Sequence, residues 1–223
     1  MERLATAAAA AASALRNPLR ADMVALLGDA TGEATLRRMR QRMLEDAVGR
    51  RLLRERPRLR SVALAPAALR VLPDGSLGRA YLGFMEHYGF SADGRPAVRE
   101  DMLADGELAW VMARYREGHD FTHVLTGLPP TLAGELALKV VEAVQTGLPV
   151  AQLSALAGPL RLKRPGRWLR EAPAIYAWAA SCGRQAKPAT CLDIERRLAE
   201  PLSSCRGRWG YTYPPPRALR EIV

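Results

Sequence analysis

Apolar side chains recur every three or four residues along most of this chain, and this spacing constrains the fold more than any other feature of the sequence. In residues 33–53, Leu36, Met39 and Met43 follow it, and arginines line the opposite side. Such spacing puts the apolar side chains on one face of a helix. No stretch alternates apolar and polar residues for long enough to predict a strand. The sequence therefore predicts an all-α fold.

Glycine and proline divide this pattern into segments. The sequence predicts helices over residues 5–16, 33–53, 77–88, 105–127, 131–147, 152–156, 165–182 and 192–202. Gly127 is suited to end one helix and Thr131 to cap the next. Residues 105–147 are therefore expected to form an αα-hairpin.

The chain of 223 residues is long enough for a single compact helical domain with a sizeable core. We expect that domain over residues 17–205. Residues 1–16 form either a first Ala-rich helix or a short targeting remnant, and Glu2 favours the helix. Residues 206–223 are expected to be a tail. The three cysteines match neither a zinc finger nor a disulfide scaffold, which indicates a reducing compartment.

The net charge of +10 is unevenly distributed. Residues 1–61 carry +6, residues 62–150 carry −4 and residues 151–223 carry +8. Arginine-rich surfaces bind phosphates, whether of nucleic acid or of anionic lipid headgroups. Because aromatic residues make up only 6% of the chain and no nucleic-acid-binding motif is present, we expect an anionic membrane surface as a partner and no nucleic acid. The longest uncharged run, residues 143–160, is too broken by Gln, Gly and Pro to span a membrane.

One stretch concentrates side chains that bind metal ions. His119 and His123 are four residues apart, so they share one helix face, which also carries the apolar Leu108 and Met112. In an antiparallel hairpin, Glu135 falls at the height of His123. Two imidazoles and a carboxylate that converge in this way suit Zn²⁺ or another divalent ion, with open positions for a substrate.

Asp120 follows His119, about 100° around the helix. It could bind the ion from the flank, orient His119 or act as a base, and the spacing leaves these roles open. A histidine pair satisfied within a core is the alternative to a metal site. Arg114, before this pair, could bind a substrate carboxylate, although a surface ion pair is its expected role.

A second class of metal enzyme competes for the same residues. The HD phosphohydrolase superfamily is all-helical and uses the order His…His-Asp…Asp. His87, His119, Asp120 and Asp193 follow that order. This assignment leaves the second histidine of the pair and the glutamate without a role.

Residues 115–129 (YREGHDFTHVLTGLP) resemble the hallmark of the ubiquinone (coenzyme Q) biosynthesis protein 4 homolog family. The resemblance continues at residues 134–135 and 142–149 (EAVQTGLP), and earlier segments such as residues 17–28 fit as well. It covers roughly residues 15–200 and is poor from residue 206 onward.

The resemblance implies a zinc protein at a membrane. Members are helical, peripheral proteins of the mitochondrial inner membrane on its matrix side, or of bacterial membranes on the cytoplasmic face. They belong to the multi-subunit coenzyme Q biosynthetic complex, so other coenzyme Q biosynthesis proteins are implied partners, and homo-oligomer formation is left open. The zinc motif of the family, His-Asp-x-x-His-x(11)-Glu, is present here as His119, Asp120, His123 and Glu135.

The implied activity is that of a carbon–carbon lyase. This decarboxylase removes the C1 carboxyl group of 4-hydroxy-3-methoxy-5-polyprenylbenzoate, by simple decarboxylation or with hydroxylation at C1. Asp120 or a water on the ion would relay the proton. The prenyl tail would lie near residues 143–160 or near Tyr81 and Phe84, which could equally be ordinary core. The alternatives are a non-catalytic scaffold of the complex that binds prenylated lipid and, further, the HD-type phosphohydrolase.

Overall fold

The regular secondary structure is helical throughout the part of the chain that the structure describes. The computed structural model describes residues 32–60, 65–91, 103, 105–158 and 165–215. Within them, strand-like pairing is limited to one isolated antiparallel bridge between Ser76 and Pro201. The helices are α3 (Glu33–Glu45), α4 (Ala47–Glu55), α6 (Pro66–Arg70), α7 (Leu77–Tyr88), α8 (Gly106–Thr126), α9 (Leu132–Thr146), α10 (Pro149–Ala157), α11 (Pro165–Gln185), η4 (Ala189–Cys191), η5 (Ile194–Arg196) and α12 (Leu202–Trp209). The predicted all-α class and single helical domain are confirmed.

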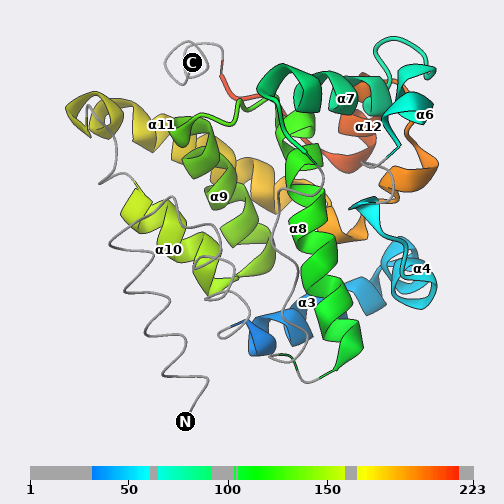
Figure 1. Cartoon of the computed structure of the whole chain (residues 1–223). Helices are drawn as coiled ribbons and strands as arrows, with labels where there is room; N and C mark the ends of the chain where they lie inside the picture. The colour runs from blue at the N-terminus through cyan, green and yellow to red at the C-terminus, as the bar shows by residue number, and fades with distance from the viewer. Residues whose placement is uncertain (1–31, 61–64, 92–102, 104, 159–164, 216–223) are drawn as a thin grey trace.

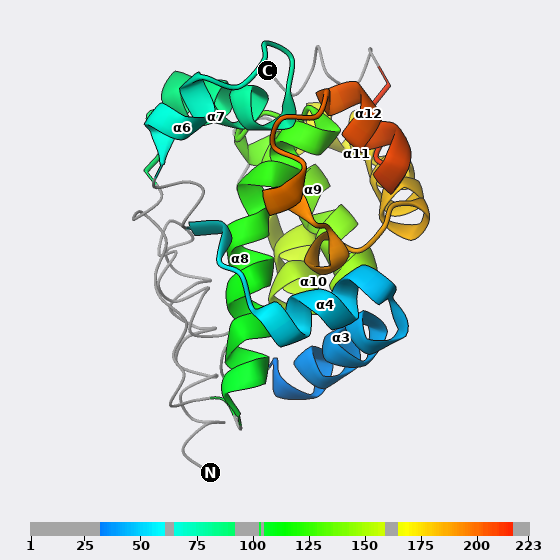
Figure 2. The ribbon, with the colours of Figure 1, turned by 90° about the vertical axis from the view of Figure 1, so that its right-hand side faces the viewer.

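Helix α8 runs through the centre of the molecule (Figure 1), and most of its residues are buried. Helices α3 and α4 lie at one end of α8, and α6 and α7 lie at the other (Figure 2). Helix α9 packs most extensively against α10 and α11. Because α8 is covered on nearly every side, its polar side chains are enclosed and need partners inside the protein.

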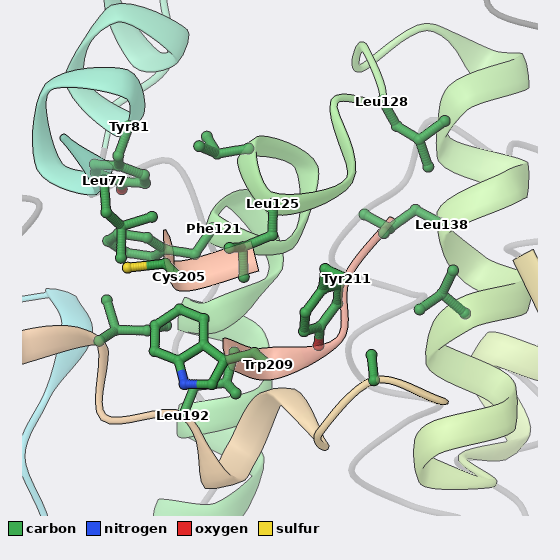
Figure 3. Close-up of a cluster of buried hydrophobic side chains, with 14 of the residues drawn as sticks. Leu77, Tyr81, Phe121, Leu125, Leu128, Leu138, Leu192, Cys205, Trp209 and Tyr211 are labelled. Atoms are coloured by element: carbon green, nitrogen blue, oxygen red, sulfur yellow. The ribbon is translucent and has the colours of Figure 1, made fainter. Parts of the chain in front are cut away.

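Two apolar clusters flank α8. The larger one joins α7, α9, α11 and α12 to the C-terminal half of α8 (Figure 3). In it, the ring of Tyr81 stacks on that of Phe121 with 3.9 Å between centroids. The second cluster joins α3 and α4 to the N-terminal half of α8 through residues such as Leu36, Met43 and Met112. Tyr81 is thus part of the core, which was one of the two alternatives that the sequence left open for it; the other was contact with a prenyl tail.

The central helices begin and end where the sequence predicts. Asp105 caps α8 by accepting a hydrogen bond from the Leu108 N–H at 2.7 Å, and Thr131 caps α9 through the Gly134 N–H at 3.2 Å. Gly127, at φ 71°, ends α8 in the left-handed conformation that glycine favours. Helix α7 also matches its predicted range at both ends. These caps fix where the two central helices begin and end.

The single helix predicted over residues 33–53 is wrong, because the chain breaks at Asp46. Asp46 has an extended backbone (φ −97°, ψ 134°), and its carboxylate accepts a hydrogen bond from the Gly49 N–H at 2.8 Å. An aspartate can satisfy the first N–H groups of a new helix in this way. Gly49 permits the tight corner, since an added Cβ would lie 2.3 Å from the Met43 carbonyl oxygen. The result is two helices, α3 and α4, in place of one.

The helix predicted over residues 192–202 is also wrong. The chain there forms η4, η5 and connecting turns, and Asp193 bonds the guanidinium groups of Arg197 and Arg51. A regular helix starts only after Pro201. It runs through the predicted boundary at residue 205, and Trp209 and Tyr211 are buried in the larger cluster.

Other boundaries differ less. The tail predicted over residues 206–223 begins inside α12, so the helical domain extends further than expected. Helices α10 and α11 are both longer than predicted, because α10 starts at Pro149 and α11 continues to Gln185. The predicted helix at residues 5–16 lies outside the described residues.

Candidate metal centre

Three side chains from α8 and α9 bring their ligand atoms together. His119 and His123 are buried near the C-terminal end of α8, and Glu135 lies in the first turn of α9 with 34% of its side chain exposed. The two Nε2 atoms are 3.2 Å apart. Glu135 places Oε1 at 3.1 Å from His123 Nε2 and Oε2 at 3.4 Å from His119 Nε2. The structure thus assembles the histidine pair and the glutamate that the sequence singled out.

Both imidazole rings are held by their other nitrogen. The Nδ1 atom of His119 lies 2.6 Å from Glu142 Oε1, and the Nδ1 atom of His123 lies 2.9 Å from the Leu128 carbonyl oxygen. A carbonyl oxygen and an ionised carboxylate only accept hydrogen bonds, so both Nδ1 atoms donate. In the neutral rings, both Nε2 atoms therefore present lone pairs to each other and to Glu135.

This arrangement fits a small divalent cation. Tetrahedral zinc with bonds of about 2.0–2.2 Å has neighbouring donor atoms about 3.3–3.6 Å apart. The observed separations are close to that range: 3.2 Å between the two Nε2 atoms, 3.1 Å from His123 Nε2 to one oxygen of Glu135, and 3.4 Å from His119 Nε2 to the other oxygen. Three acceptors face one another at these distances, and a cation between them would remove their repulsion. Imidazole and carboxylate are also donor types that zinc prefers.

The carboxylate of Glu142 is a further buried component of the centre. Its second oxygen, Oε2, accepts from the Tyr115 hydroxyl at 2.7 Å and from Lys139 Nζ at 2.6 Å. Burial raises the pKa of Glu142, but Lys139 and His119 outweigh it and hold the pKa well below its usual range. Burial likewise raises the pKa of Glu135, and the two histidines reverse the effect. Both carboxylates are therefore ionised at neutral pH.

The charge balance favours a cation at the imidazoles. Burial and the nearby Lys139 ammonium lower the pKa of His119, whereas Glu142 and Glu135 raise it, and the net shift is upward. A proton is thus attracted to this point when no other cation is bound.

Sequence reasoning missed this network around Glu142. The signal was present, since Glu142 lies seven residues after Glu135 and so falls on the same face of α9 two turns later. Tyr115 lies four residues before His119 on the matching face of α8. This spacing predicts a continuous row of polar side chains along the contact between α8 and α9. We call this row the seam; it contains Tyr115, His119, His123, Glu135, Lys139 and Glu142.

An aromatic group borders the centre. The ring of Phe84 lies nearly parallel to that of His123, with 5.5 Å between centroids. Phe84 also contacts Tyr88 and Phe90, both of which are exposed. An apolar surface therefore extends from the buried imidazole to the solvent.

Asp120 follows His119 in the sequence, and it is buried. Among the described residues, the group whose ligand atoms lie within 4.8 Å of one another contains His119, His123 and Glu135 and does not contain Asp120. Its role as ligand or proton relay stays a prediction.

The residues of the alternative HD set are not brought together in this group. His87 is exposed at the end of α7, with its ring against that of Tyr88, and Asp193 is bound to arginines. The surface ion pair expected for Arg114 is wrong. Only 1% of Arg114 is exposed, and it pairs with Glu195 and donates to the Leu192 carbonyl oxygen at 2.5 Å.

The fold and the site together define a class of protein. It is a single helical domain in which two imidazoles and a carboxylate meet where the central helices α8 and α9 pack together. Comparison with known proteins identifies the family. The family model described as coenzyme Q (ubiquinone) biosynthesis protein Coq4 matches residues 1–215, and the chain belongs to this family. The match includes residues 206–215, where the sequence had indicated a poor fit.

Individual relatives are similar to nearly the whole of this chain. The ubiquinone biosynthesis protein COQ4 homolog, mitochondrial, of Bos taurus is 44% identical over 217 residues, which cover 97% of this chain and 81% of that protein. The homolog of the same name from Homo sapiens is 44% identical over 209 residues, covering 94% and 78%. These relatives support a role of this chain in ubiquinone biosynthesis.

A solved structure has the same fold. It is that of a candidate ubiquinone biosynthesis protein from Nostoc punctiforme, with a TM-score of 0.71 and 18% identity, and the match covers 92% of this chain and 96% of that one. In the described part of the present chain, no helix combines the length and apolar character needed to cross a membrane.

Proposed function

We propose that this protein is a carbon–carbon lyase of ubiquinone biosynthesis. It removes the C1 carboxyl group of 4-hydroxy-3-methoxy-5-polyprenylbenzoate with the help of Zn²⁺, or another divalent ion, held by His119, His123 and Glu135. One observation carries the metal assignment: ligand atoms of the three side chains lie within 4.8 Å of one another, and the Nδ1 bonds of both histidines commit their Nε2 atoms to accept. Membership of the ubiquinone biosynthesis family supports the choice of substrate.

Each protein group has a defined task in this mechanism. A bound divalent ion would supply positive charge for the substrate carboxylate and act as a Lewis acid. Phe84 offers an apolar face for the benzoate ring beside His123, and the exposed Tyr88 and Phe90 extend that surface toward the prenyl tail. Asp120 is the proposed proton relay. In simple decarboxylation carbon dioxide leaves and C1 takes up one proton, whereas the oxidative route places a hydroxyl group at C1 and consumes an oxidant.

The location we propose is the surface of a membrane. Two exposed leucines of α10, Leu153 and Leu156, offer apolar contacts, and residues 151–223 carry a charge of +8 that suits anionic headgroups. Because the relatives named above are mitochondrial, the proposed site is the matrix side of the inner membrane, or the cytoplasmic face in a bacterium. Other coenzyme Q biosynthesis proteins are the proposed partners.

A second candidate is a non-catalytic scaffold in which the ion joins α8 to α9. The burial of both imidazoles favours this alternative. Structural zinc usually has four protein ligands, and the group of three found among the described residues favours the enzyme instead.

The substitution Glu135→Ala tests the enzyme. Metal content, the helical circular dichroism signal and release of carbon dioxide are measured together, with and without oxygen. We expect metal and turnover to be lost while the helical signal is kept. Glu86→Ala is the control, because Glu86 lies exposed on α7 and pairs with Arg70. Normal turnover in Glu135→Ala would refute the catalytic proposal, and full metal-loaded folding without turnover in the wild type would favour the scaffold.

A further inference from the structure

Glu142 is the one carboxylate of the seam whose oxygens point away from the converging atoms. Only 5% of the residue is exposed, and its carboxylate is hydrogen-bonded to three groups: His119, Tyr115 and Lys139. The bonds are divided between its oxygens. Oε1 faces the His119 imidazole, whereas Oε2 accepts from the hydroxyl and the ammonium. One oxygen is thus committed to the histidine alone.

We propose that Glu142 is a positioning residue that keeps the proton of His119 on Nδ1 and so presents Nε2 to the cation. The inference rests on the proposed metal centre. His123 is oriented by a backbone carbonyl, which no side-chain substitution removes. Glu142 is therefore the side chain through which the tautomer can be changed. Acceptors behind metal-binding histidines commonly set the tautomer and the ring orientation in this way.

If the buried Glu142 carboxylate only stabilised the fold, its substitution would leave the tautomer of His119 unchanged. A positioning role predicts a change of tautomer. Lys139 and Tyr115 are both donors to Oε2, so a glutamine at this position turns its amide oxygen toward them. Its NH₂ group then faces His119 Nδ1 and donates to it. The proton of the ring moves to Nε2, which donates to Glu135 or to His123. In Glu142→Gln the polar groups of the seam are therefore hydrogen-bonded without an ion. Zinc must displace the proton on His119 Nε2 before it can bind there.

The test compares the full-length wild type with Glu142→Gln. Zinc affinity is measured by competition with a chromophoric chelator. The tautomer is read from the ¹⁵N chemical shifts of the imidazole nitrogens in the metal-free protein, at a pH where the rings are neutral. Thermal unfolding of the metal-free protein reports stability. We expect zinc affinity to fall by about 10–100-fold and Nε2 to be protonated. The thermal midpoint should fall as well, because Lys139 loses its ion pair.

Glu195→Gln is the matched control. Glu195 pairs with the buried Arg114, which lies in α8 like His119, and Glu195 does not belong to the metal group. It should lower the thermal midpoint and leave zinc affinity and the tautomer unchanged.

The outcomes separate the two proposals. Wild-type zinc affinity in Glu142→Gln, or a ring that keeps its proton on Nδ1, overturns the role of Glu142. If Glu195→Gln lowers zinc affinity as much as Glu142→Gln does, the loss of affinity reflects lost stability, and this result overturns the role of Glu142 as well. If the wild type binds no zinc, the proposed metal centre fails. The ¹⁵N shifts still show whether Glu142 holds the tautomer.

Discussion

Gly134 should control the metal centre although it has no side chain. It lies in the first turn of α9, where an added Cβ would be 2.0 Å from the Pro129 carbonyl oxygen, and real Cβ atoms stay at least 3.0 Å from such neighbours. In Gly134→Ala the Pro129 carbonyl must therefore move by about 1 Å, or the start of α9 must move with it. Pro129 directly follows Leu128, whose carbonyl orients His123.

The effect on the site follows from one distance. The Nδ1 atom of His123 is 2.9 Å from the Leu128 oxygen, and a displacement of about 0.5 Å already carries it beyond the usual hydrogen-bond range. Overpacking of this kind costs about 1–3 kcal/mol of unfolding free energy. Loss of a partner behind a metal ligand lowers metal affinity by about 10–100-fold. Both effects are expected in Gly134→Ala.

The assay is urea unfolding of the metal-free protein, together with zinc titration against a chelator. Gly207→Ala is the matched control, because Gly207 lies in α12 and its added Cβ meets no atom within 4 Å. That variant should gain about 0.5–1 kcal/mol and bind zinc as the wild type does. If Gly134→Ala binds zinc normally and unfolds at the same urea concentration, the turn does not orient His123 and the reasoning is refuted.

Two further predictions concern the periphery. Burial raises the pKa of Asp46, but hydrogen bonds from Lys187 and the Gly49 N–H outweigh it and hold the pKa below its ordinary 3.8. A lowered pKa stabilises the fold fully above pH 3.8, and this stabilisation is lost as the pH falls through the pKa of the folded state. The difference in unfolding free energy between wild type and Asp46→Asn should therefore narrow in acid. Urea titrations at several pH values measure this difference. Asparagine also caps helices, so an unchanged gap would show that the ion pair with Lys187 contributes nothing. Leu156 is 78% exposed on α10, and Leu156→Glu should weaken sedimentation with vesicles that contain anionic lipid, whereas Val71→Glu, at an 83% exposed position after α6, should not. Wild-type binding should also weaken with salt, and equal binding to neutral vesicles at high salt would refute the electrostatic part.

Local signals predicted much of this fold. The caps Asp105 and Thr131 and the glycine that follows each central helix act on the few residues beside them, so the bounds of α8 and α9 were predictable. The break at Asp46 was not, because the apolar spacing continues across it. Two features of the folded corner favour two helices over one: the Asp46 carboxylate caps the Gly49 N–H, and Gly49 lies close to the Met43 carbonyl.

Long-range partners were the harder part. Arg114 carries no local sign that Glu195, far along the chain, enters the core to meet it, so a buried ion pair looked like a surface one. Asp193 likewise leaves a helical pattern to bind Arg51. The pairing of His119 and His123 with Glu135 was accessible because all three lie in consecutive helices joined by a short turn. Glu142 lies in the same helix, and a search for metal ligands alone passed over it.

The charges along the α8–α9 seam give the site a preference that its geometry alone does not. Glu135 and Glu142 are ionised, Lys139 is protonated, and Tyr115, whose pKa is raised by burial and by Glu142, stays neutral. With neutral imidazoles, Glu135, Glu142 and Lys139 together carry one net negative charge, and a divalent cation would change this to one positive charge. A single carboxylate on the substrate then brings the seam to neutrality, which a buried site requires. Without Lys139 the occupied seam would already be neutral, and a bound carboxylate would remain uncompensated. The lysine is therefore part of the reason why the proposed metal centre would suit the proposed benzoate substrate.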